Sequence, residues 1–140
     1  MMKKVAIYVC GEVSKKCTAN GCLRTFNEKE DSFKRYEEVG SQLVAFNNCN
    51  GCDGDPVGSL QVKIEKLKKA EVQVVHISTC IRGRCEYYKE FVKEFAKHFD
   101  VIGYTHGSEK GKKNNNISIN KVSLWEIMNE TSQKSKKQIS

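Results

Sequence analysis

Short apolar runs alternate with stretches of helical spacing over most of the chain. Four runs rich in β-branched and other apolar residues predict buried strands. They cover residues 3–9, 42–46, 72–78 and 101–104. Between the runs, apolar residues recur at every third or fourth position, as on the buried face of a helix. This spacing predicts helices over residues 23–36, 60–67 and 88–99. We expect Thr18 or Asn20 to cap the first helix and Gly40 to terminate it.

Strands that alternate with helices of about 12 residues form right-handed βαβ units on a parallel sheet. We therefore predict a single α/β domain of three layers over residues 1–108. Its four-stranded parallel sheet has the flavodoxin-like order 2-1-3-4, with helices on both faces. Residues 109–140 are expected to form a basic linker and a C-terminal extension, in which apolar residues between 117 and 128 predict a short strand or helix.

Composition and charge narrow the function classes. No run approaches the roughly 18 apolar residues of a membrane-spanning helix, and the N-terminus lacks the long apolar region of a signal peptide. We expect a cytoplasmic protein without a membrane partner, in a reducing compartment where lasting disulfides are uncommon. Residues 109–140 carry seven lysines and three glutamates, which is +4 of the net charge of +7. Such ends are more often solvated than bound to phosphate, so we expect no nucleic-acid partner.

Cysteines fall where the predicted strands end. Cys10 follows the first run, and Cys49 follows the second and opens a C-x-x-C motif with Cys52. Cys80 follows the third run and His106 follows the fourth. The carboxyl ends of parallel strands share one edge of the sheet, where open α/β folds place their sites. Thiolate and imidazole groups gathered there predict a metal or redox centre.

Eight side chains are candidate metal ligands. They are Cys10, Cys17, Cys22, Cys49, Cys52, Cys80, Cys85 and His106. We expect a site centred on Cys10, Cys49, Cys52 and Cys80. Neighbouring strands lie ~4.8 Å apart, so Cys49 and His106, on opposite edges, are not expected to share one ion. Two small sites, one larger cluster, or one site with spare thiols all fit this ligand set.

These residues resemble a known family. The resemblance covers residues 3–107 and rests on Cys10, Cys17, residues 46–54, residues 78–81 and residues 104–106. They are similar to the CGGC-domain proteins, a group of small, largely uncharacterised prokaryotic proteins to which metal binding, with zinc suggested, is attributed. The resemblance implies ligand roles for Cys10, Cys17, Cys49, Cys52, Cys80, Cys85 and His106. Cys22 matches a variant found in part of the group, and Asn50 stands where the name-giving motif has glycine.

The other histidines and two arginines have ordinary explanations. His76 lies inside the third strand and is expected to be a buried, hydrogen-bonded imidazole. His98, near the end of the third helix, is expected to be a favourable charge there. Arg82 and Arg84 could stabilise a thiolate or hold an anion, or could simply be solvated in a loop.

Three functions remain open from the sequence. The first is zinc binding, which thiolate and imidazole ligands suit, and the second is an iron–sulfur cluster. The third is a thiol–disulfide redox enzyme that uses Cys49 and Cys52. A binding protein is favoured over an enzyme, because five further thiols exceed what such an enzyme needs. A cysteine-dependent phosphatase is excluded because no cysteine has an arginine six positions on, and no loop is a clear phosphate cradle for a flavin.

Overall fold

The computed structural model of the chain describes residues 2–50, 55–107 and 118–119. The strands are β1 (Lys3–Val9), β2 (Ser41–Asn48), β3 (Val74–Ile77), β4 (Asp100–Ile102) and β5 (Ser118–Ile119). The α-helices are α1 (Asn20–Glu28), α2 (Leu60–Lys69), α3 (Thr79–Arg84) and α4 (Tyr88–Ala96). Two 3₁₀ helices are η1 (Val13–Lys15) and η2 (Asp31–Tyr36).

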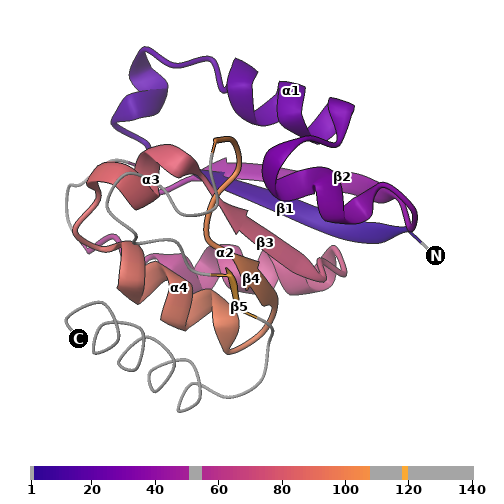
Figure 1. Cartoon of the computed structure of the whole chain (residues 1–140). Helices are drawn as coiled ribbons and strands as arrows, with labels where there is room; N and C mark the ends of the chain where they lie inside the picture. Colours follow the sequence, from indigo (N-terminus) through magenta and orange to yellow (C-terminus); the bar gives the residue numbers. More distant parts are fainter. Residues whose placement is uncertain (1, 51–54, 108–117, 120–140) are drawn as a thin grey trace, which may run out of the picture.

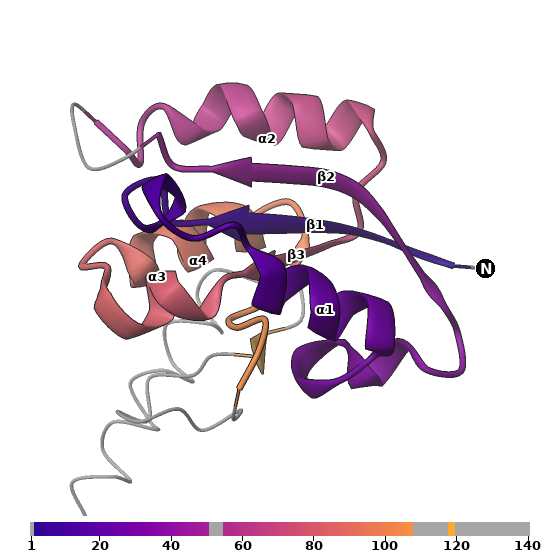
Figure 2. The same ribbon diagram turned by 90° about the horizontal axis from the view of Figure 1, so that it is seen from above.

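The strands form one sheet in the order β2-β1-β3-β4-β5. Figure 2 shows β2, β1 and β3 side by side. The first four are parallel, which confirms the predicted α/β fold and the order 2-1-3-4. β5 pairs antiparallel with β4 and lies in the span for which the sequence predicts a short strand or helix. The boundary predicted at residue 108 stays a prediction, because most of residues 109–140 lie outside the described residues.

Helices cover both faces of the sheet and give three layers (Figure 1). On one face, alternate residues of β1 pack against α1 and η2 in a cluster that contains Ile7, Phe26 and Phe33. On the other face, the intervening residues of β1 pack against α2 and α4. The two-residue period of a strand thus assigns each side chain of β1 to one face.

β2 carries one extra residue relative to β1. The register shifts between Val5 and Ala6 of β1 because Val44 of β2 has no partner there. The last pair of the two strands is Val9 with Asn48. A bulge of this kind changes the face to which all following side chains of the strand point.

The first predicted helix is wrong in its length and in its cap. α1 ends at Glu28, because Lys29 takes a left-handed backbone with φ of 57°, and the separate helix η2 follows. The residue before α1 is Ala19, also left-handed with φ of 64°, and no side chain caps the helix. Neither Thr18 nor Asn20 therefore fills the expected capping role.

Part of the connection after β3 is a helix that the periodicity does not predict. α3 begins directly after Ser78, which places Cys80 in its first turn and Cys85 at its end. The predicted third helix is α4, which ends at Ala96. No helix in the described part of the chain is long and apolar enough to cross a membrane.

Candidate thiol site at the carboxyl ends of the strands

Cys10 and Cys49 lie side by side at the ends of adjacent strands. They come directly after Val9 and Asn48, the last pair of β1 and β2. Both are buried, with 4% and 6% of their surfaces exposed, and both belong to the core cluster on the α2 and α4 face. The backbone N–H of Gly11 donates a hydrogen bond to Cys49 Sγ over 3.2 Å.

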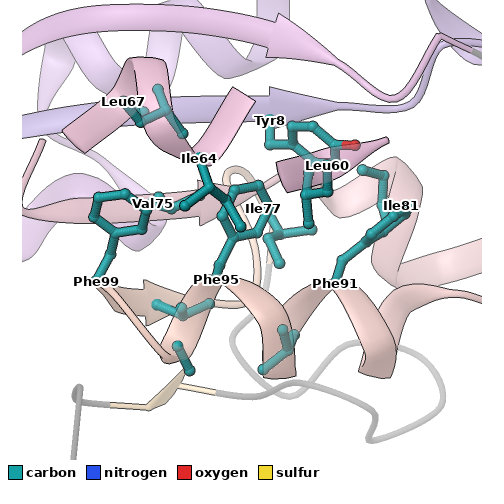
Figure 3. Packing of buried hydrophobic residues seen from close by; sticks show 14 of the residues in the cluster. Tyr8, Leu60, Ile64, Leu67, Val75, Ile77, Ile81, Phe91, Phe95 and Phe99 are labelled. Carbon is teal, nitrogen blue, oxygen red and sulfur yellow. The ribbon is translucent and has the colours of Figure 1, made fainter. Parts of the chain in front are cut away.

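The hydroxyl of Tyr8 lies near three cysteine thiols. Burial raises the pKa of Tyr8, and the nearby Cys49, Cys85 and Cys10 raise it further. In Figure 3 this hydroxyl points toward the end of the core where Ile81 lies. Three thiols from three different loops therefore lie near one phenol at the carboxyl ends of the strands. We call Cys10, Cys49 and Cys85 the Tyr8-side thiols.

Lys63 of α2 places a cation beside these thiols. Its ammonium group donates a hydrogen bond to the carbonyl of Asn48 and lies 5.7 Å from the centre of the Tyr8 ring. Burial lowers the pKa of Lys63, and the nearby Cys49 offsets part of that effect. The amine is therefore held against the strand end by its contacts with β2 and Tyr8.

The turn after Cys49 needs a left-handed residue. Asn50 has φ of 64°, and its N–H donates to the side-chain oxygen of Asn48 over 2.6 Å. Asparagine and glycine tolerate this backbone better than other residues do. The asparagine that departs from the C-G-G-C pattern is thus compatible with the turn, while Cys52 lies outside the described residues.

A second group of thiols lies on the α1 side of the sheet. Cys22 belongs to the α1 core cluster and its Sγ lies 3.2 Å from the hydroxyl of Thr105. Burial raises the pKa of Cys22, Thr105 lowers it, and the nearby Cys80 and Cys17 raise it. Cys80 also lies 2.8 Å from the hydroxyl of Ser78, and the exposed Cys17 accepts the N–H of Ala19 over 3.3 Å.

His106 belongs to this second group and not to the Tyr8-side thiols. A Cβ atom added to Gly21 of α1 would meet the His106 ring at 3.3 Å, so the ring lies directly against the start of α1. The Thr79 hydroxyl donates to the His106 carbonyl over 2.6 Å. Burial lowers the pKa of His106, while Asp31 raises it and Arg24 and Arg82 lower it.

The seven described candidate ligands thus fall into two groups, with Cys80 near both. Cys80 interacts with Cys22 and also packs against the core that holds Cys10 and Cys49. Among residues 2–50, 55–107 and 118–119, no three Cys, His, Asp or Glu side chains form a group that could hold a metal ion. The described structure supplies the neighbouring pair Cys10 and Cys49, and the expected ligand Cys52 is not among the described residues.

The remaining sequence predictions meet different outcomes. His76 is fully buried and hydrogen-bonded, as expected, with Tyr36 and Ser32 on its two ring nitrogens. His98 lies two residues beyond the end of α4. Arg82 is buried, with its guanidinium 5.2 Å from the Tyr104 ring centre, so a solvated position is wrong for this residue. The side chain of Arg84 is not among the parts of the chain that the structure describes.

The sequence did not single out Tyr8 or Lys63. The signal for Tyr8 was present, because residues two apart on a strand share a face and Cys10 follows Tyr8 by two. Lys63 precedes the buried Ile64, so helical periodicity assigns it only to the polar side of α2. Its contact with the carbonyl of Asn48 depends on how α2 lies beside β2.

Comparisons with known proteins identify the family. The CGGC domain model matches residues 4–106. An uncharacterised protein of Methanocaldococcus jannaschii is 31% identical over 108 residues, which cover 70% of this chain and 80% of that protein. No solved structure matches the chain.

Proposed function

The chain belongs to the CGGC domain family, and from this premise we propose that it binds a soft metal ion through cysteine thiolates at the carboxyl ends of its strands. Zinc is the preferred metal. The observation that carries the proposal is that Cys10 and Cys49 follow the last residue pair of adjacent parallel strands. Two thiols held side by side are the starting element of a thiolate metal site.

The surroundings of the pair also fit thiolate ligands. A backbone N–H donates to Cys49 Sγ, and donors of this kind orient metal-bound sulfur and balance its charge. Cys52 follows Cys49 by two residues, the spacing of chelating cysteines. Cys85 lies near the same Tyr8 hydroxyl. Cys10, Cys49 and Cys52 are thus the residues that would hold the ion. Cys85 would have to move toward them to join as a ligand, because the described residues hold no group of three such side chains around one point.

Zinc is preferred because it accepts four thiolates in a closed tetrahedral site and needs no redox chemistry. When bound, the ion would supply structural cross-linking between the strand ends. The protein's own residues would exclude water from the site, since Cys10 and Cys49 are buried. An iron–sulfur cluster is the alternative that the same thiolates could bind.

Elemental analysis of full-length protein purified without oxygen tests the proposal. We expect stoichiometric zinc and a colourless solution, whereas a brown solution with stoichiometric iron would indicate a cluster. Cys10→Ser and Cys49→Ser should lose most of the metal. The matched control, Cys17→Ser, should retain it, because Cys17 is exposed and lies with the other group of thiols. Metal-poor wild-type protein with freely titratable thiols would refute metal binding.

A thiol–disulfide redox enzyme is the second candidate. Lys63 beside Cys49 favours it, since a neighbouring cation and an N–H donor stabilise negative charge on the attacking sulfur. Wild-type protein that contains little metal and has freely titratable thiols would favour this redox function over metal binding.

A further inference from the structure

We propose that Cys10 and Cys49 form one reversible disulfide, with Cys49 as the thiol that reacts with hydrogen peroxide and Cys10 as the thiol that resolves it. The proposal concerns the same two thiols as the proposed metal site and describes how oxidation would regulate them. It does not require the metal, because the pairing follows from the positions of the two cysteines and the roles follow from their protein neighbours. The C-x-x-C motif by itself would instead pair Cys49 with Cys52.

The distance between the two cysteines suits a disulfide. The nitrogen of Gly11 is two bonds from Cys10 Cα, and it lies 3.2 Å from Cys49 Sγ. Cys49 Sγ is therefore within about 6 Å of Cys10 Cα. Adjacent strands bring Cα atoms to ~4.8 Å, inside the ~4.4–6.8 Å range of disulfides.

The bulge in β2 makes this pairing possible. Val44 is the extra residue, and after it each residue of β1 pairs with a β2 residue one position later in the chain than it otherwise would. Without the bulge, Cys10 would lie beside Asn48 and Cys49 would point to the other face. With it, both thiols enter the same core cluster. Bulges that re-aim a side chain are common beside functional sites.

A backbone N–H and one lysine lie beside Cys49. Cys49 Sγ accepts the N–H of Gly11, and the amine of Lys63 is fixed on the carbonyl of Asn48, the residue that precedes Cys49. Both contacts stabilise negative charge as it develops on this sulfur. They assign the attacking role to Cys49 and leave the resolving role to Cys10.

Burial selects the oxidant. Cys49 is 6% exposed and Cys10 is 4% exposed, which shields both from bulky disulfides such as oxidised glutathione. Hydrogen peroxide is about the size of two water molecules and can reach a sulfur with little exposure. Thiolate reactivity at a shielded site would thus be specific for a small peroxide.

The chemistry balances with one peroxide. The Cys49 thiolate attacks one peroxide oxygen, the O–O bond breaks, and hydroxide leaves to take a proton and become water, which gives a sulfenic acid on Cys49. The Cys10 thiolate then attacks that sulfur, the S–O bond breaks, and a second water leaves. Two thiols have lost two electrons to form the disulfide, and peroxide has gained them. A small dithiol would reduce the disulfide by exchange.

Disulfide mapping of the full-length protein tests the pairing. Reduced wild-type protein, with and without prior removal of metal by a chelator, is treated with equimolar peroxide, its remaining thiols are blocked, and tryptic peptides are analysed by tandem mass spectrometry. Cys49 and Cys52 share the peptide of residues 36–63, so fragment ions that break the chain between them assign the bond. We expect Cys10 bonded to Cys49. A dominant Cys49–Cys52 bond, or no bond to Cys10 in metal-free protein, would overturn the proposal.

Variants test the roles. In Cys10→Ser, Cys49 should accumulate as sulfenic acid that dimedone traps, whereas Cys52→Ser and Cys22→Ser should still form the Cys10–Cys49 bond. Lys63→Met should slow oxidation by roughly 3- to 10-fold, the effect of one nearby charge. Lys66→Met, on the exposed side of the same helix, should not. Equal oxidation rates in the Lys63→Met and Lys66→Met proteins would show that Lys63 does not activate Cys49.

These outcomes separate the two proposals. Disulfide formation in a protein that contains no metal would refute only the metal site. Stoichiometric metal without a Cys10–Cys49 bond after chelation would refute only the disulfide. The mapping on wild-type protein does not depend on whether any variant folds.

Discussion

The hydroxyl of Tyr36 lies 2.7 Å from Nε2 of His76 in the middle of the sheet. On the other side of the ring, Nδ1 lies 3.0 Å from the hydroxyl of Ser32 and 3.2 Å from the carbonyl of Tyr104. Phe33 stacks on the ring with centres 4.3 Å apart. The imidazole therefore links β3, of which His76 is part, to η2 and to the segment that follows β4, while no part of it is exposed.

This arrangement predicts that the protein loses stability in mild acid. Burial lowers the pKa of His76 to about 3, whereas an unfolded histidine titrates near 6.5. Above that value both states are neutral and the stability is complete. As pH falls toward 3, only the unfolded state binds the proton, so the free energy of unfolding decreases by up to about 1.4 kcal/mol for each pH unit.

Urea unfolding at pH 7, 6 and 5 measures the effect. His76→Gln should flatten the dependence on pH, while His98→Gln, near the end of α4, should leave it unchanged. If the His76→Gln protein loses stability with acid as steeply as wild type, another group is responsible.

Two buried serines offer a matched test of the same hydrogen bonds. The Ser32 hydroxyl donates to the carbonyl of Thr105 over 2.8 Å and contacts His76. The hydroxyl of Ser41, also buried, has no hydrogen-bond partner among the described residues. Ser32→Ala should therefore cost about 1–3 kcal/mol, and Ser41→Ala should cost little or stabilise the fold. Thermal unfolding of the two variants compares them, and equal losses would mean that the hydrogen bonds of Ser32 contribute nothing.

The left-handed turn at Asn50 predicts how the protein responds to substitution there. Asn50→Gly should be tolerated and should retain the proposed metal, because glycine adopts φ of 64° without strain. Asn50→Val should destabilise the turn by about 1–2 kcal/mol and lower metal content, since it displaces Cys49. Metal analysis and thermal unfolding of the pair check this, and a valine variant that behaves like the glycine variant would argue against a constrained turn.

The sequence predicts the sheet better than it predicts the site. The apolar runs identify the four parallel strands, and the rules for connections between strands in βαβ units give their order. The strand ends then bring Cys10 near Cys49. The bulge at Val44 is not visible in the apolar pattern, yet it decides the face on which Cys49 lies.

Local backbone conformation accounts for the other failures. Lys29 ends α1 with a positive φ that favours glycine or asparagine, and no such residue marks that position. α3 is only six residues long, which is too short to show a helical period in the sequence. As a result, the sequence places Cys80 at a strand end but does not show that it lies near Cys22.

The position of His106 against α1 gives a last prediction. An alanine at Gly21 would place its Cβ atom 3.3 Å from the His106 ring, which is tighter than ordinary contact, so the ring must shift. An alanine at Gly83 of α3 meets nothing within 4 Å and should be neutral or stabilise the helix by up to about 1 kcal/mol. Nuclear magnetic resonance of the histidine rings should show His106 moving in Gly21→Ala but not in Gly83→Ala. Because His106 lies apart from Cys10 and Cys49, both variants, and His106→Ala, should keep the metal that those cysteines bind. Loss of that metal in His106→Ala alone would make the imidazole a ligand and would require the two groups of thiols to share one ion.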